Sequence, residues 1–297
     1  MRVCFAVPVR DKAKFLRRTV NAVLSQECSP IEILFSDQGS TDGSWEILKD
    51  IKSKYDGPHN LRIVQCPETS VRGMPGLNEH LNWIHNQTDA EVFISSAADD
   101  VPYPSRARKT IEAFERHNPS MVITGMYFAE VDGSYGGETG FPTEDGWVKV
   151  DEVYTRYVGG STTQAWTREF YEKIGGLQGV GSPDMVLPFL ACVDKGAYYL
   201  NERLHVYCRV SDPSNTGLEG VYAAAKDENE KLALEELMHF QVTAGIYTAA
   251  SKMKEAGLDT QEATNALVAQ IVDRAASWQN VRQRMSLLKV QPLGFKS

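Results

Sequence analysis

The stretch VCFAVPVRDKAKFLRRTVNAVL, residues 3–24, carries the clearest structural signal in the chain. Its first seven residues are almost all apolar, which predicts a short strand buried on both faces. Apolar residues then recur at helical spacing, with cations between them: Phe15, Leu16, Val20, Val23 and Leu24. A buried strand followed directly by an amphipathic helix is the first half of a βαβ unit.

The same alternation continues outward from this unit through the first half of the chain. Strand-like runs follow at residues 31–36, 61–66, 91–96 and 121–126, with helical spacing in the intervals between them. This order predicts an α/β fold with an open, mainly parallel sheet flanked by helices. In such sheets ligands bind at the carboxyl ends of the strands, and acidic clusters stand at two of those ends, after residues 36 and 96.

The pattern changes twice beyond residue 126. A glycine-rich stretch with acidic residues, 133–146, predicts a long loop of the kind that often carries function. From about residue 221 the apolar spacing is helical throughout, and a cluster of proline and glycine precedes it. We therefore predict a sheet domain over residues 1–215 and an α-helical region over residues 216–297.

Composition limits the classes of function. The five cysteines are scattered and never form a CxxC pair, which argues against a disulfide framework or a structural zinc site and favours a cytoplasmic location. No apolar run approaches the ~20 residues of a membrane span, and the N-terminus does not resemble a signal peptide. The net charge of -8 argues against a surface built mainly for phosphate. After Asp273, however, every charged side chain is basic. The C-terminal stretch is therefore either a solvated helix end or a contact for an anionic partner.

Two acidic clusters carry the candidate chemistry. In SDQGSTDGS, residues 36–44, Asp37 leaves a strand before glycines and hydroxyls, and can accept a hydrogen bond from a base. The alternative for this cluster is an Asx-rich turn that caps the next helix. In Ala98-Asp99-Asp100, two adjacent carboxylates either hold a divalent cation or form a solvated acidic turn.

Together and in this order, these motifs resemble those of the family 2 glycosyltransferases, whose catalytic domain has the Rossmann-like GT-A fold. The resemblance runs from Val3 to about Ser211 and is carried by four segments: VPVRDKAKFLRRTVNAVLSQ at 7–26, DQGSTDGS at 37–44, RGMPGLN at 72–78, and ADD at 98–100 with Pro104. It implies an enzyme that transfers a sugar from a nucleotide sugar, usually of uridine, by metal-assisted single displacement with inversion.

The resemblance also implies a role for individual residues. The nucleotide-sugar-binding positions are Pro8, Val9, Arg10, Asp37, Gln38, Arg72, Asn78, Asp99 and Arg209. Within this set, Asp37 would bind the base and Asp99 would contact the ribose or a water molecule. Asp100 would ligate Mn²⁺ or Mg²⁺ on the donor diphosphate.

Two further positions are assigned by the same resemblance. Asp184, which precedes a helix-like segment, would be the catalytic base, and a helix N-cap is its alternative role. Trp166 would offer a flat apolar face on the acceptor side, unless it packs in the core.

Three positions depart from the family pattern. Gln38 replaces the second acid of the first motif, and Ala97 stands where many relatives have an acid, which leaves more of the metal ligation to Asp100. Val210 occupies a place where the family often has a histidine, and His205 would fill that role only in a different register.

Other readings of the chain remain as alternatives. A nucleotidyltransferase would usually carry glycines after the first strand, which VPVRDKAK lacks, and a Rossmann dehydrogenase would need a GxGxxG that follows none of the strands. A non-catalytic nucleotide-sugar-binding module of the same fold stays open. The acceptor also stays open among a saccharide, a protein-linked or lipid-linked glycan, and hydroxymethylated bases of DNA, as in bacteriophage enzymes that resemble this family.

Overall fold

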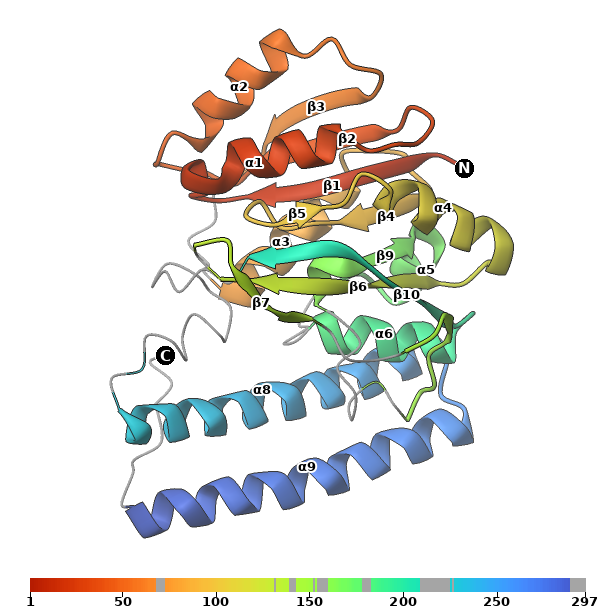
Figure 1. Ribbon diagram of the computed structural model, residues 1–297. Helices are drawn as coiled ribbons and strands as arrows, with labels where there is room; N and C mark the ends of the chain where they lie inside the picture. Colours follow the sequence, from red (N-terminus) through yellow and green to blue (C-terminus); the bar gives the residue numbers. More distant parts are fainter. Residues whose placement is uncertain are drawn as a thin grey trace.

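The computed structural model describes residues 1–67, 73–130, 132–138, 143–151, 153, 160–177, 183–208, 225 and 227–288. Within these residues one ten-stranded sheet is covered by helices on both faces (Figure 1). The strands are β1 (Val3–Val9), β2 (Glu32–Asp37), β3 (Asn60–Gln65), β4 (Val92–Ser95), β5 (Val101–Pro102), β6 (Met121–Ala129), β7 (Tyr135–Glu138), β8 (Gly146–Trp147), β9 (Gln164–Thr167) and β10 (Ala197–Cys208).

The helices follow the alternation expected from the sequence. They are α1 (Ala13–Leu24), α2 (Ser44–Lys54), α3 (Gly73–His85), α4 (Arg106–His117), α5 (Arg168–Lys173), α6 (Pro183–Val193), α8 (Glu228–Glu255) and α9 (Gln261–Leu288). A short 3-10 helix, η1 (Ser161–Thr163), leads directly into β9.

The sheet has the order β3-β2-β1-β4-β9-β6-β10-β5, with β7 paired to β6 and β8 to β10. Strands β3, β2, β1 and β4 are parallel, as the alternation of strands and helices predicts. Strand β9 runs antiparallel to both of its neighbours, β4 and β6, and β10 is again parallel to β6. The sheet is therefore mixed, and its parallel half contains the polar strand ends.

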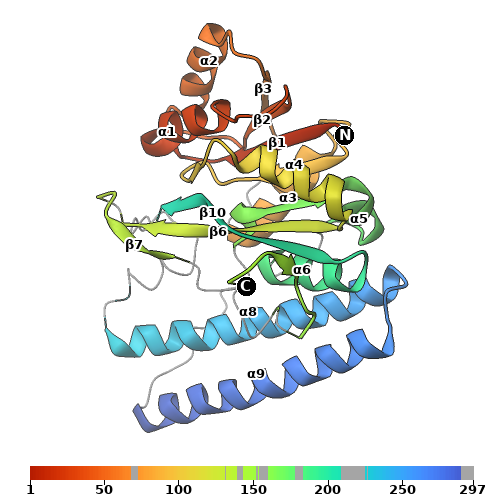
Figure 2. The ribbon, with the colours of Figure 1, turned by 45° about the vertical axis from the view of Figure 1, so that its right-hand side comes forward.

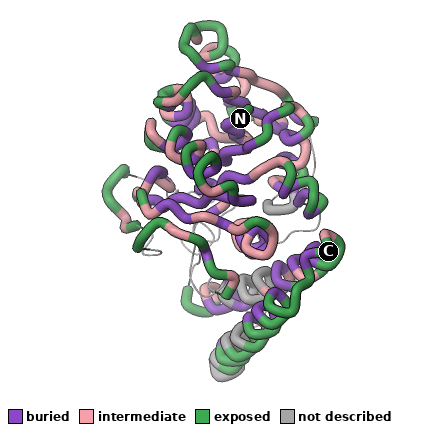
Figure 3. The backbone as a smooth tube through the Cα atoms, turned by 90° about the vertical axis from the view of Figure 1, so that its right-hand side faces the viewer, coloured by how far each residue is buried: buried purple, intermediate pink, exposed green. Residues whose placement is uncertain are grey.

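Strand β1 shows why the first apolar run is a strand buried on both faces. Cys4 and Ala6 belong to the apolar cluster on the face covered by α3 and α6, whereas Phe5 and Val7 belong to the cluster on the face covered by α1, α2 and α4. Alternate side chains of a strand point to opposite faces, so both faces need apolar residues. Figure 3 shows the result as a buried interior with exposed segments around it.

Helices α8 and α9 lie side by side beyond α6 (Figures 1 and 2). Ile246 and Met253 of α8 and Leu267 of α9 share one apolar cluster with α6. Lys252 of α8 also donates a hydrogen bond from Nζ to the carbonyl oxygen of Ile174, at 2.9 Å. The described part of residues 216–297 thus contains two long helices packed on the rest of the fold, and the division into two domains stays a prediction.

Two sequence-based expectations for the second half of the chain fall partly outside the described residues. The boundary near residue 215 lies there, as do the last nine residues of the basic C-terminal stretch. Of the cations in that stretch, Arg282 donates from Nε to Glu236 of α8 at 2.6 Å. None of the described helices is both long enough and apolar enough to cross a membrane.

Candidate functional site

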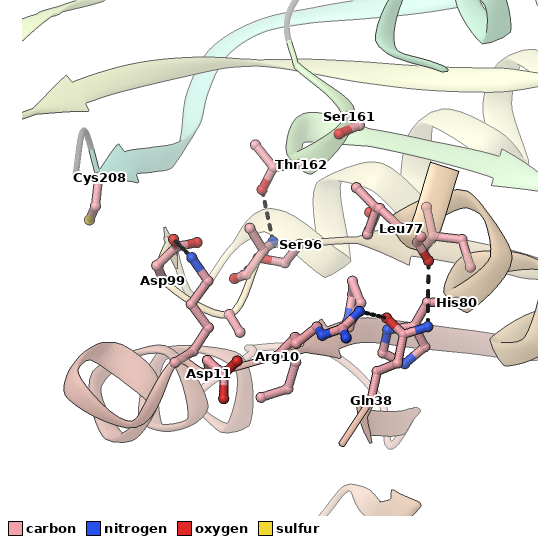
Figure 4. A pocket seen from close by; sticks show the side chains of 18 of the residues that line it. Arg10, Asp11, Gln38, Leu77, His80, Ser96, Asp99, Ser161, Thr162 and Cys208 are labelled. Carbon is pink, nitrogen blue, oxygen red and sulfur yellow. Dashed lines mark hydrogen bonds and ion pairs between the residues drawn. The ribbon is translucent and has the colours of Figure 1, made fainter. Parts of the chain in front are cut away.

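A cavity of about 370 Å³ opens at the carboxyl ends of β1 and β4. Its walls are formed by the loops after β1, β2 and β4, the first half of α3, η1 and the end of β10 (Figure 4). Five of the residues predicted to bind the nucleotide sugar line it: Pro8, Val9, Arg10, Gln38 and Asp99. The structure thus brings together residues that lie up to 91 positions apart in the sequence.

The loop between β1 and α1 is fixed to the loop after β2. Asp11 has a left-handed backbone with φ of 51°, a conformation that aspartate tolerates better than most residues. Its backbone N–H donates to Ser40 Oγ at 2.9 Å, and its Oδ1 accepts from Thr41 N at 2.8 Å. Lys12 N donates to Ser44 Oγ at 2.9 Å. These bonds hold both loops in one arrangement at the edge of the cavity.

Asp42 adds to this connection between the loops. Its carboxylate accepts from Ser44 N at 3.0 Å and from Ala13 N at 2.8 Å, in the first turn of α1. Burial acts to raise the pKa of Asp42, but the hydrogen bonds from Ser44 and Ala13 outweigh it and lower the pKa. Part of the first acidic cluster, SDQGSTDGS, therefore has the turn-forming role that was its alternative.

Asp37 and Gln38 lie at the end of β2 with different surroundings. Asp37 is fully buried; its Oδ2 accepts from Ser40 N at 3.1 Å, and its Oδ1 has no hydrogen-bond partner among the described residues. Gln38 faces the cavity, where Oε1 accepts from Arg10 at 3.4 Å and Nε2 donates to the Gly76 carbonyl at 3.5 Å (Figure 4). A buried carboxylate oxygen without a donor is costly, and Asp37 is not among the residues that line the cavity. Its role in binding the base stays a prediction.

Asp99 is the member of the acidic pair that faces the cavity. Its Oδ2 lies 2.6 Å from Nζ of Lys12, an interaction drawn as a dashed line at Asp99 in Figure 4. Burial and the neighbouring Asp100 raise the pKa of Asp99, although Lys12 opposes the shift. A carboxylate in this position needs a positive charge nearby, and Lys12 supplies it. The sequence analysis did not identify Lys12 in this role.

Asp100 points away from the cavity into a buried network. It is 1% exposed and accepts three hydrogen bonds: from Cys208 N at 3.0 Å, from Thr162 Oγ1 at 2.8 Å and from His205 Nε2 at 3.0 Å. Its oxygens are thus occupied by protein donors. The expectation that Asp100 ligates the metal does not fit this arrangement, and the geometry favours Asp99 for that role instead.

Asp184 lies in the first turn of α6 and is partly buried. Its backbone carbonyl accepts from Gln164 Nε2 at 3.0 Å. Gln164 follows η1, whose Ser161 and Thr162 line the cavity, so Asp184 is connected to the cavity wall through β9. Burial raises the pKa of the Asp184 carboxyl.

Trp166 lies in the core, which is the alternative role considered for it. It is 2% exposed, and its indole N–H donates to His85 Nε2 at 2.8 Å. The His85 ring is stacked between Phe93 and Tyr171, with ring centroids 3.6 Å away on each side. Burial, with a smaller contribution from Arg168, lowers the pKa of His85 to about 2, so this histidine is a neutral acceptor. The acceptor-side role predicted for Trp166 is therefore not supported.

Replacement of this tryptophan separates a core role from an acceptor role. Trp166→Phe removes the only donor to His85 Nε2 found in the described part of the chain, and leaving a buried acceptor unpaired costs about 1–3 kcal/mol. We expect a lower free energy of unfolding in urea and unchanged apparent affinities for donor and acceptor. Unchanged stability with a raised KM for the acceptor would restore Trp166 to the acceptor side.

The remaining predicted residues divide into two groups. Asn78 is buried in α3 and is absent from the described lining of the cavity. Arg72 and Arg209 lie outside the described residues. Of the cavity residues that the sequence analysis missed, His80 is the most distinctive: its Nε2 lies 2.7 Å from Ser36 Oγ, and burial lowers its pKa to about 4. No motif pointed to it.

An α/β sheet covered by helices, with a cavity at the ends of β1 and β4 that is lined by Asp99 and Lys12, is the arrangement expected of a GT-A glycosyltransferase. Comparison with known proteins specifies the family. The model of the family described as "Glycosyl transferase family 2" matches residues 4–163, and the chain belongs to this family. The resemblance stated from the motifs is confirmed, and the nucleotidyltransferase and dehydrogenase alternatives are set aside.

Two curated relatives carry the same class of name. The uncharacterized glycosyltransferase alr2836 of Nostoc sp. is 26% identical over 131 residues, 44% of this chain and 37% of the relative. The putative glycosyltransferase EpsE of Bacillus subtilis is 25% identical over 126 residues, 42% of this chain and 43% of the relative. The chain thus matches less than half the length of either relative.

Solved structures share the fold over almost the whole chain. Residues 1–349 of TarS from S. aureus superpose with a TM-score of 0.63 at 16% identity, covering 98% of this chain and 76% of that one. The mannosyltransferase PcManGT of Pyrobaculum calidifontis, in complex with GDP-Man and Mn²⁺, gives a TM-score of 0.55 at 15% identity, covering 96% and 83%. At these identities the likeness shows the fold, and the predicted GT-A fold is confirmed.

Proposed function

We propose that this chain transfers a sugar from a nucleotide-sugar donor, with a UDP-sugar as the first candidate, to an acceptor hydroxyl by metal-assisted single displacement with inversion. The observation that carries the proposal is a cavity at the strand ends whose lining includes the ion pair of Asp99 and Lys12. Family membership supports the reaction class. TarS in complex with UDP-GlcNAc supports the donor class, because that structure covers 97% of this chain with a TM-score of 0.58.

The donor base would bind at the β1 and β2 end of the cavity. Pro8 and Val9 supply an apolar surface there, and the unpaired Oδ1 of Asp37 would accept a hydrogen bond from a ring N–H. Arg10 and Gln38 place a guanidinium and an amide at the same end. Arg72, Asn78 and Arg209 stay candidates for donor binding by the family resemblance alone.

The residues at Asp99 fit a divalent cation that is completed by the donor. The described residues contain no group of three or more His, Cys, Asp or Glu side chains that could hold an ion. Mg²⁺, however, is commonly bound through one or two carboxylates plus substrate phosphates, and Asp99 offers one carboxylate to the cavity. Mn²⁺ or Mg²⁺ bound there would neutralise the diphosphate charge that grows as the sugar leaves. Lys12 would contribute a second positive charge at the diphosphate.

Asp184 is the proposed base for the acceptor hydroxyl. A positioned general base typically contributes ~10²–10⁴-fold to the rate, and a carboxyl whose pKa is raised by burial binds the transferred proton more strongly than a solvated one. A base opposite the leaving diphosphate gives a single displacement with inversion. Gln164 follows η1 and donates a hydrogen bond to the Asp184 backbone, and this bond would hold the base at a fixed position relative to the cavity wall.

The decisive experiment is a titration of the purified chain with UDP-glucose, UDP-GlcNAc and GDP-mannose, each with and without Mn²⁺. A donor at 100 times its Kd adds about 2.7 kcal/mol to the free energy of unfolding, which thermal unfolding detects. We expect a metal-dependent rise in midpoint with one donor. No rise with any donor would contradict the proposal, whereas binding without sugar release or transfer would favour a non-catalytic binding module.

A further inference from the structure

A chain of buried polar groups runs from α4 to the loop after β4. Arg106, which is fully buried, donates from Nη1 to His205 Nδ1 at 3.0 Å and from Nη2 to the Ser95 carbonyl at 2.7 Å. On its other side, His205 Nε2 lies 3.0 Å from Asp100 Oδ2 and 2.9 Å from Thr162 Oγ1. Thr162 Oγ1 is 2.8 Å from the same Asp100 oxygen. The network thus has a charged group at each end, Arg106 and Asp100, and two neutral groups, His205 and Thr162, between them.

The direction of each hydrogen bond follows from the groups themselves. Arginine has donors only, so His205 Nδ1 accepts and its ring proton lies on Nε2, which donates toward Asp100. Ala97 N donates to Thr162 Oγ1 at 3.0 Å, which leaves the threonine proton for Asp100. All of these hydrogen bonds are compatible with one arrangement of protons, and buried networks of connected hydrogen bonds restrict the motion of their members. Within the described residues only Nε of Arg106 is left without a partner in this network.

This network holds the backbone on both sides of Asp99. Before it, the Ala97 amide is bonded to Thr162; after it, the Asp100 carboxylate is bonded to Thr162 and His205. From α1, Arg18 Nη2 also donates to the carbonyl oxygen of Asp99 itself, at 3.0 Å. Thr162 of η1 also lines the cavity, so it joins the Asp99 loop to η1.

We propose that Thr162, Asp100 and His205 are positioning residues that fix the Asp99 carboxylate toward the donor diphosphate. The inference rests on the proposed function, because it gives these residues a task in donor binding. It also explains why Asp100 is present although it does not reach the cavity. The two carboxylate oxygens of Asp100 accept the hydrogen bonds that fix the orientation of Asp99. Groups behind a metal ligand typically affect metal affinity or activity by 10–100-fold when they are replaced.

Two matched pairs of variants test the proposal. Thr162→Val removes the hydroxyl but keeps the shape, whereas Thr162→Ser keeps the hydroxyl. His205→Leu removes both ring nitrogens, whereas His205→Gln retains one acceptor for Arg106 and one donor for Asp100. We expect Thr162→Val and His205→Leu to weaken the binding of UDP with Mn²⁺ by about 10–100-fold, and Thr162→Ser and His205→Gln to restore most of it.

The readouts separate positioning from general destabilisation. UMP carries the base and ribose without the diphosphate, so its affinity should be unchanged in all four variants. Amide hydrogen exchange at Ala97 should accelerate in Thr162→Val and not in Thr162→Ser, because only the first loses the acceptor. Equal losses for UDP and UMP, or unchanged UDP affinity with unchanged exchange at Ala97, would overturn the inference. If the wild-type chain binds no nucleotide, the proposed function fails, and with it the role in donor binding.

Discussion

Asp184→Asn is expected to lower the turnover number by about 10²–10⁴-fold while the donor affinity stays unchanged. The amide keeps the size of the side chain but cannot take a proton from the acceptor hydroxyl. Because Asp184 lies in the first turn of α6, outside the described lining of the donor cavity, the substitution leaves the donor contacts intact. Steady-state kinetics with saturating donor and acceptor, together with donor titration, measure both quantities.

The same variant has an expected effect on stability. Burial raises the pKa of Asp184, so the folded state holds this proton to higher pH than the unfolded state does. Stability from this group is fully present below the unfolded pKa and is lost as pH rises through the folded pKa. The amide does not ionise, so Asp184→Asn should be at least as stable as the wild type at neutral pH. In the wild type, turnover should fall as pH drops through the raised pKa, since the base becomes protonated.

Asp259→Asn is the matched control, because Asp259 is exposed in the connection between α8 and α9. It should change neither turnover nor the pH dependence of stability. Wild-type turnover in Asp184→Asn would show that another group removes the proton. Lower turnover with an equally large loss of stability would indicate that Asp184 serves only as part of the α6 N-terminus.

Asp99→Asn should abolish the metal-dependent part of donor binding and lower kcat/KM by about 10²–10³-fold, the size seen when one group that stabilises transition-state charge is removed. The amide lacks the charge that would hold a divalent cation, and Lys12 loses its ion-pair partner. Stability should change little, because Lys12 reaches solvent. The stabilisation by UDP plus Mn²⁺ in thermal unfolding is the measurement.

Asp100→Asn provides the contrast that decides between the two carboxylates. The amide nitrogen or oxygen would have to face His205, Thr162 and Cys208 N, and all three donate to the native carboxylate. Leaving one of these buried donors without an acceptor costs about 1–3 kcal/mol, and the buried Arg106 loses the favourable influence of the Asp100 charge. This variant should therefore lose stability as well as donor binding. A stable Asp100→Asn that loses only its response to Mn²⁺ would return the metal to Asp100.

The sequence predicted the parts of the fold that depend on short-range pattern. An apolar run like that of β1 and a helical spacing like that of α1 alternate along the sequence as far as α4. Because β1, β2 and β4 are parallel, the polar residues that follow these strands lie at the same edge of the sheet. Strand β9 was not predicted, because four residues, QAWT, are too few to show a period. Its insertion between β4 and β6 makes the sheet mixed.

The direction of neighbouring side chains in a loop could not be read from the chain. Asp99 and Asp100 are adjacent and chemically identical, and the donors that hold Asp100 in the interior, Thr162, His205 and Cys208 N, lie 62 to 108 positions away in the sequence. The same limit applies to Trp166 of β9, whose hydrogen-bond partner His85 lies in α3. Asp37 and Gln38 could be placed at the end of a strand because an apolar run followed by polar residues and glycine is a local signal.

The packing of α8 on α6 has a consequence for anyone who shortens the chain. Ile246, Ala249 and Met253 of α8 share their apolar cluster with Val186 and Leu190 of α6, the helix whose first turn carries Asp184. A version that ends after residue 215 would leave this surface in water and should precipitate on expression. By contrast, a protease cut between β10 and α8 would yield two fragments that stay associated, and the C-terminal fragment supplied in trans should rescue the truncated one.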